Sequence, residues 1–158
     1  MRVSQNLGLQ YERDFWALGY VDDFELQCLY HMAKALVMPT IYQAGSFPII
    51  EAAIASCPVI CSNIPVHVEQ AELLGNNIWL FDPQDANNLA DIIEQMLINI
   101  EVTSKRAKLA AEMVGQVYSW QMAAEGYLSV FREALKGSIT NTAGISPPHC
   151  QDNDNNLA

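Results

Sequence analysis

The stretch that decides the fold runs from Leu36 to Pro65 and reads LVMPTIYQAGSFPIIEAAIASCPVICSNIP. Two short apolar runs, at residues 36–38 and 59–61, each stand next to a proline and predict buried strands. Residues 46–56 between them have the composition of a helix. A strand, loop, helix and strand in this order predict a βαβ unit, in which the strands are parallel and the helix covers one face.

The loop of residues 39–46 follows the carboxyl end of the first predicted strand, which is where ligands bind in such sheets. It leads into the predicted helix, whose start is indicated by Ser46 as a hydroxyl cap and Pro48 in the first turn. Free N–H groups and the positive end of the helix dipole face the loop, and they favour a phosphate or another anion.

Glu51 falls in the second turn of this helix. Side chains tilt toward the start of a helix, so its carboxylate is within reach of the crevice beside the loop. Two carboxylate oxygens can accept hydrogen bonds from two neighbouring hydroxyls, as on a ribose or a hexose. From the spacing alone, a solvated helix residue is an equally good interpretation of Glu51.

The segment PTIYQAGSFPIIEAAIASCPVICS, residues 39–62, resembles the donor-binding segment of the group 1 retaining glycosyltransferases, which use nucleotide sugars and have the GT-B architecture. Members of that family commonly read P-S-x-Y-E-G-F-G-x-P-x-x-E-A-M-A-x-G-x-P-V-I-x-S. The resemblance implies that Glu51 holds the donor ribose. It further implies that Gln43, at the position of the family's first glutamate, is the catalytic residue and engages a hydroxyl of the donor sugar. It also implies that the backbone contacts the sugar and the diphosphate at four residues, namely Ala44, Gly45, Ser46 and Phe47.

Length and composition predict a single packed domain, because the chain has 158 residues and 51% of them are hydrophobic. There are 18 acidic and 8 basic residues, giving a net charge of -10, so nucleic acid and anionic membrane surfaces are not expected partners. No apolar run reaches the roughly 20 residues of a membrane span, and no secretory signal is visible. A cytoplasmic location is therefore expected.

The cysteines and histidines have no metal-ligand spacing, so we predict neither a metal nor a cofactor. Cys57 and Cys61 flank the second predicted strand and are expected to be ordinary buried thiols. His67 lies just after that strand, at the correct edge of the sheet for a ligand contact. A surface position is the favoured interpretation of His67.

Similar patterns predict the remaining elements. A strand is expected at residues 15–21. The helix expected after it opens with a capping box of Asp22 and Glu25, and its apolar face includes Tyr30. A short helix is expected at residues 67–75 and a strand at 78–81. Three more helices are predicted from apolar residues at helical spacing, at residues 85–100, at 105–118, and at 121–135 with Tyr127, Val130 and Phe131 facing inward.

The predicted fold class is α/β, a partial Rossmann-like parallel sheet flanked by helices. We divide the chain into an N-terminal remnant (1–14) that closes a helix, the main domain (15–136) and a disordered tail (137–158). The family resemblance covers residues 15–135 and implies an incomplete C-terminal lobe of a GT-B enzyme, without the N-terminal lobe that holds most of the acceptor. No basic residue lies between Ala35 and Ser104, which leaves a diphosphate short of cations.

Three interpretations follow. In the first, the chain is the donor-binding part of a glycosyltransferase that transfers a sugar with retention of configuration and needs a separate N-terminal lobe. In the second, it is a catalytically inactive nucleotide-sugar-binding or assembly module, and an open sheet edge favours homo-oligomers. In the third, it is another parallel α/β nucleotide-binding domain. The register of the motif favours the first.

Overall fold

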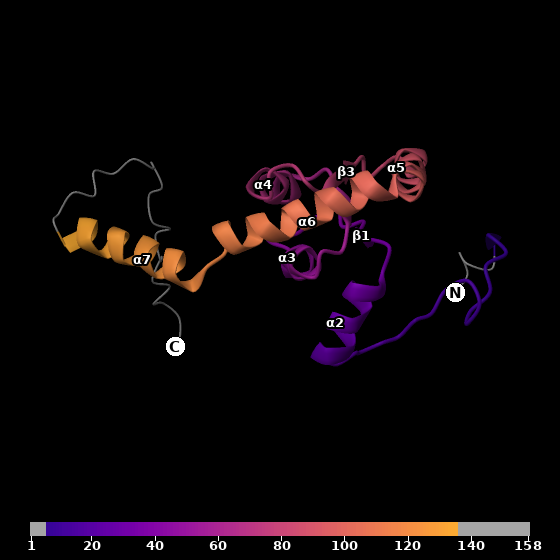
Figure 1. Cartoon of the computed structure of the whole chain (residues 1–158), viewed down its shortest axis with the longest axis horizontal. Helices are drawn as coiled ribbons and strands as arrows, with labels where there is room; N and C mark the ends of the chain where they lie inside the picture. The colour runs from indigo at the N-terminus through magenta and orange to yellow at the C-terminus, as the bar shows by residue number, and fades with distance from the viewer. Residues whose placement is uncertain (1–5, 136–158) are drawn as a thin grey trace, which may run out of the picture. The chain divides into compact units, whose positions relative to one another are not determined.

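The computed structural model describes residues 6–135, and the chain divides into two units, Met1–Tyr118 and Ser119–Ala158 (Figure 1). The described elements of the first unit are α2 (Asp23–Met32), β1 (Leu36–Met38), α3 (Phe47–Ile54), β2 (Val59–Ser62), α4 (Pro65–Leu73), β3 (Trp79–Phe81), α5 (Ala86–Ile98) and α6 (Ile100–Val117). The second unit contains α7 (Trp120–Leu135). The predicted tail at 137–158 lies outside the described residues.

The sheet is parallel and has the order β1-β2-β3. Leu36 pairs with Val59 across the first ladder, and Ile60 pairs with Trp79 across the second. Both crossovers run in the same direction across the sheet, so α3 and α4 cover the same face. The α/β fold class predicted from the sequence is therefore confirmed, and the carboxyl ends of all three strands lie at one edge.

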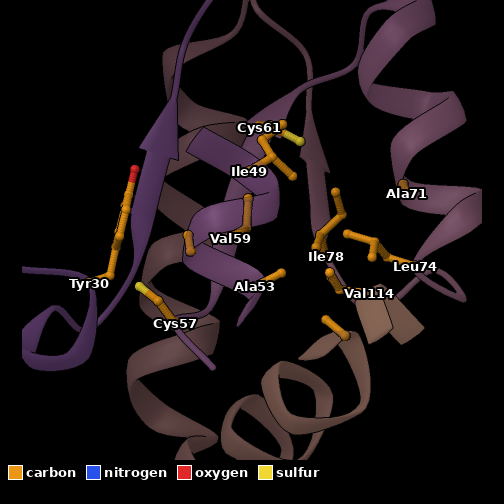
Figure 2. Close-up of a cluster of buried hydrophobic side chains, with 12 residues drawn as sticks. Tyr30, Ile49, Ala53, Cys57, Val59, Cys61, Ala71, Leu74, Ile78 and Val114 are labelled. Atoms are coloured by element: carbon orange, nitrogen blue, oxygen red, sulfur yellow. The ribbon is translucent and has the colours of Figure 1, made fainter. Parts of the chain in front are cut away.

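The core has two parts, one on each face of the sheet. The larger cluster joins α3 and β2 to α4 and α6, and Figure 2 shows Ile49, Val59, Leu74 and Val114 meeting within it. The smaller cluster, on the other face, is formed by Ile60, Phe81 and Met96 together with apolar residues of α5. All four residues of β2 are buried, because helices cover the strand on both faces.

Helix α6 is tied to the start of β3 by a cation. The guanidinium of Arg106 donates to the carbonyl oxygens of Asn76, at 2.7 Å, and Ile78, at 2.9 Å, and it lies 3.9 Å from the ring centroid of Trp79. Burial lowers the pKa of Arg106, which nevertheless stays charged at any physiological pH. Arg106 therefore stabilises the amino-terminal edge of the sheet.

The strand expected at residues 15–21 was a wrong prediction. Only a single bridge, between Tyr11 and Phe15, is present there, and the residues that follow form neither helix nor strand. Trp16 and Tyr20 are exposed, and Gly19 has a φ of 69°, which an extended strand does not allow. The sequence has the composition of a strand, but a strand also needs a partner, and the described sheet provides none.

The helices after β3 also differ from the prediction. Helix α5 ends at Ile98, and after Asn99 the next helix begins at Ile100 instead of residue 105. The hydroxyl of Thr103 donates to the carbonyl of Met96, at 3.1 Å, across this junction. The helix predicted at residues 85–100 wrongly included Ile100, which is the first residue of the next helix.

Helix α7 shows no buried residue, so the predicted inward positions of its apolar side chains are not observed. Tyr127, Val130 and Phe131 are exposed, and the rings of Tyr127 and Phe131 contact each other at 6.3 Å between centroids. Helical spacing alone identified an apolar stripe, and it does not specify what that stripe packs against.

Two predicted helix ends agree with the structure. The capping box of α2 is present, because the Asp22 side chain accepts from the backbone of Glu25 and the Glu25 side chain accepts from the backbone of Asp22. After α4, Gly75 has a φ of 64° and donates its N–H to the carbonyl of Glu72. Glycine accepts this left-handed conformation without strain, so it ends the helix.

We expect Leu74→Ala to destabilise the first unit by about 2–5 kcal/mol, because Leu74 is fully buried between α4 and α6 and its removal leaves a cavity. The neighbouring Leu73→Ala is the matched control, since Leu73 is 37% exposed, and it should cost about 1 kcal/mol or less. Urea unfolding followed by circular dichroism measures both values. Equal losses in the two variants would contradict the described position of α4.

Candidate functional site

The carboxyl edge of the sheet carries three helix starts, and those of α3 and α4 have no side-chain cap and no acidic residue in the first turn. Ser46 occupies the N-cap position of α3, but its hydroxyl makes no capping hydrogen bond, and the first turn contains no acidic residue. By contrast, the Asp85 carboxylate caps α5 by accepting from the N–H groups of Asn87 and Asn88, at 2.9 and 3.1 Å. The backbone donors of α3 are thus left free of a side-chain cap.

Three side-chain contacts hold backbone oxygens at this edge. The hydroxyl of Ser62 donates to the carbonyl of Met38, where β1 ends, at 3.0 Å. The Nδ1 atom of His67 lies 3.0 Å from the carbonyl of Ser62, where β2 ends, and it must carry a hydrogen because a carbonyl oxygen can only accept. The Nε2 amide of Gln70 donates to the carbonyl of Ser46 at 3.0 Å.

These contacts fix the start of α3 relative to both strands. Because α4 supplies His67 and Gln70, a single helix holds the end of β2 and the N-cap of α3 at the same time. The predicted surface position of His67 was wrong, since its side chain is fully buried in α4. The hydroxyl cap predicted for Ser46 is also absent, although Ser46 stands at the predicted N-cap.

Three buried polar atoms around these contacts have no hydrogen-bond partner among the described residues. They are Oγ of Ser46, Nε2 of His67 and Oε1 of Gln70. With Nδ1 protonated, a neutral His67 presents Nε2 as an acceptor, as Gln70 presents Oε1. This side of α3 is therefore rich in hydrogen-bonding capacity that the described fold does not use.

The loop before α3 brings the other predicted donor-binding residues together at its surface. The side chain of Gln43 donates to the carbonyl of Gly45 within the same loop. Ala44 and Gly45 are exposed, and Phe47 is exposed at the first position of α3. The backbone of this loop is accessible beside the helix start, as a segment that contacts a ligand through its N–H groups requires.

Glu51 is also exposed, and its carboxylate has a partner on another helix. The hydroxyl of Tyr30 in α2 donates to Oε2 of Glu51 at 3.2 Å. Burial of the phenol, and after it the negative charge of Glu51, raise the pKa of Tyr30 to about 12. Both residues line a groove of about 480 Å³ between α2 and α3, together with Asp23, His31 and others.

Two cations of the first unit, Lys34 and Arg106, and a hollow larger than this groove lie at the opposite edge. A hollow of about 630 Å³ is lined by Lys34, Ser56 and Pro58, which precede the strands, and by apolar residues of α5 and α6. Arg106 contacts the residues before β3. The three connections that follow the strands contain no basic residue.

Cys57 and Cys61 are buried, as predicted, and burial raises the pKa of Cys61 to about 12 and raises that of Cys57. Neither thiol is a reactive thiolate near neutral pH. Within residues 6–135, no group of three or more potential ligand side chains is placed to hold a metal ion. Across the same residues, each helix is too short or too polar to span a membrane.

Comparison with known proteins identifies the family of this chain. Residues 4–113 match the family described as "Glycosyl transferases group 1". Glycogen synthase of Mycobacterium tuberculosis is 29% identical over 120 residues, which cover 76% of this chain and 29% of that protein. O-antigen chain mannosyltransferase B of Escherichia coli is 36% identical over 87 residues, which cover 54% of this chain and 22% of that protein.

Among solved structures, sucrose-phosphate synthase from Thermosynechococcus elongatus matches with a TM-score of 0.72 and 26% identity, covering 87% of this chain and 34% of that chain. Because the family match includes well over half of the residues, the chain belongs to the group 1 glycosyltransferase family. It spans about 29% of the length of the glycogen synthases that it matches.

Sequence reasoning located the helix start, the loop and Glu51, but it missed three residues that hold them in place. Tyr30 was assigned to the apolar stripe of its helix, which explains its ring and not its hydroxyl. Gln70 was not singled out, and His67 was expected at the surface. The available signal was the spacing of His67 and Gln70, two polar residues that lie about one helical turn apart after β2. This spacing indicates a polar contact from one face of α4.

We expect Ser62→Ala to lower the free energy of unfolding by about 1–2 kcal/mol, because the carbonyl of Met38 loses its donor in a buried position. Ser104→Ala on the exposed face of α6 is the control and should change stability by about 0.5 kcal/mol or less. Chemical denaturation measures the free energy of unfolding of the wild type and of both variants. A Ser62→Ala variant as stable as the control would show that this contact does not hold the edge.

Proposed function

We propose that this chain is the donor-binding part of a retaining glycosyltransferase, which transfers a sugar from a nucleoside diphosphate sugar to an acceptor. In this proposal the donor diphosphate lies at the start of α3, the backbone of residues 44–47 contacts the sugar and the diphosphate, and Gln43 engages a sugar hydroxyl. Glu51 accepts hydrogen bonds from the donor ribose. An N-terminal lobe, on a separate or longer polypeptide, supplies most of the acceptor site.

One observation carries the proposal most directly. The uncapped start of α3 and the exposed carboxylate of Glu51 lie on the same eight-residue helix, one turn apart. The first attracts an anion, and the second accepts hydrogen bonds from a diol. A nucleoside diphosphate carries both groups in one molecule, with the ribose next to the phosphates.

The relatives support the class of reaction and leave the sugar open. A glycogen synthase and a mannosyltransferase are both similar to this chain, and the first is named for its product while the second is named for the sugar that it transfers. The relatives do not specify the donor nucleotide, and UDP and GDP serve as its probes. Retention of configuration is part of the proposal, and the family resemblance in the donor segment supports it.

A second candidate function is an inactive nucleotide-sugar-binding or assembly module. Two observations favour it: Gln43 replaces a glutamate that the family commonly has, and no basic residue lies in the connections after the strands. A helix dipole contributes only about 0.3–1 kcal/mol to the binding of one charge at an exposed end, so it does not replace paired cations.

We expect calorimetric titration of the chain with UDP and GDP to show saturable binding of at least one nucleotide. Glu51→Ala should raise the Kd for that nucleotide at least about tenfold, because two hydrogen bonds to the ribose are lost. Glu94→Ala, an exposed position on α5, is the matched control and should leave the Kd unchanged. No binding by a folded wild-type chain, or equal affinities in both variants, would contradict the assignment of the site.

Gln43→Glu should increase the affinity for a nucleotide sugar relative to the free nucleotide by about three- to tenfold, because a carboxylate makes stronger hydrogen bonds to sugar hydroxyls than an amide does. UDP-glucose with UDP and GDP-mannose with GDP are suitable pairs for calorimetry. A stability measurement controls for the hydrogen bond that Gln43 donates to Gly45, which a glutamate cannot make. An unchanged ratio would indicate that residue 43 does not contact the donor sugar.

A further inference from the structure

Tyr30 combines a buried ring with a hydroxyl at the border of the candidate site. Its side chain is 8% exposed, and it is the buried residue of α2. Figure 2 shows it at the margin of the core cluster, which also contains Cys57 and Val59. Packing of the ring fixes where the hydroxyl lies, and that hydroxyl donates to Oε2 of Glu51 at 3.2 Å.

The contact joins a fixed donor to a carboxylate that would otherwise be free. Glu51 is exposed, and an exposed glutamate samples several rotamers, which it must give up when a ligand binds. No other side chain within residues 6–135 is found hydrogen-bonded to this carboxylate. The hydroxyl uses one acceptor position on Oε2, and both lone pairs of Oε1 remain for a ligand.

We propose that Tyr30 is a positioning residue that holds the Glu51 carboxylate in the orientation that accepts a ribose diol. The inference rests on the proposed function, since it assigns Glu51 to the donor ribose. Tyr30 itself contacts no ligand in this arrangement and acts through Glu51. A pKa raised to about 12 keeps the phenol protonated, and therefore a donor, at every physiological pH.

A merely structural role makes a different prediction. If Tyr30 only anchored α2, its hydroxyl would affect every nucleotide equally, whether or not the nucleotide had a diol. If it positions Glu51, its loss weakens only ligands that bind through the diol. The two roles separate when the ribose hydroxyls are removed from the ligand and the Tyr30 hydroxyl is removed from the protein.

The test is a calorimetric comparison of Tyr30→Phe with the wild type, using UDP and GDP and their 2′,3′-dideoxy counterparts. Phenylalanine keeps the buried ring and removes the hydroxyl. We expect the Kd of the ribonucleotide to rise about three- to tenfold, the size of one hydrogen bond, while the Kd of the dideoxynucleotide stays unchanged. Tyr20→Phe is the matched control, because Tyr20 is 92% exposed, and it should alter neither value.

Each other outcome overturns a specific statement. If Tyr30→Phe weakens the binding of the ribonucleotide and the dideoxynucleotide equally, Tyr30 has only a structural role. Equal wild-type affinities for the ribonucleotide and the dideoxynucleotide would show that Glu51 does not hold the ribose. The positioning role would then be wrong, while nucleotide binding itself would still be supported. A folded wild-type chain that binds neither nucleotide would overturn the proposed function and the positioning role with it.

Discussion

The first unit depends on a strand of four residues that water does not reach. Val59, Ile60, Cys61 and Ser62 are each at most 1% exposed, so every backbone N–H and C=O group of β2 must find a partner inside the protein. The partners are β1 on one side and β3 on the other, and helices cover both faces. Parallel pairing on both sides then brings the three carboxyl ends, and the starts of α3, α4 and α5, to one edge.

Much of this fold could be predicted from the sequence, because the apolar runs are short and bounded by prolines and a glycine. Local pattern failed where a distant partner decides the outcome. Residues 15–21 have the composition of a strand, yet the described chain provides no strand beside them. At Asn99 the apolar spacing continues, while the backbone changes direction with a ψ of 56° and one helix becomes two. Neither result is encoded in the spacing of hydrophobic residues.

The candidate site was predictable to the extent that it is local. Gly45, Ser46 and Glu51 stand in one short segment, and their spacing placed them at the start and on the second turn of a helix. The contacts that hold this segment come from residues that are 21 to 24 positions away in sequence, Tyr30 before it and Gln70 after it. Such contacts depend on how α2 and α4 pack, so a motif identifies the residues that face a ligand better than the residues that support them.

Helix α6 contacts elements on both faces of the sheet. Ala110 and Val114 belong to the larger cluster with α3 and α4, Thr103 bonds to α5, and Arg106 holds the start of β3. Separation of α6 from the sheet would therefore expose the larger apolar cluster and break the contacts to α5 and β3 at once. Because the elements on both faces of the sheet contact this helix, their stabilities are coupled. The consequence is that the first unit unfolds cooperatively in one transition, without a stable intermediate in which only one face of the sheet stays covered.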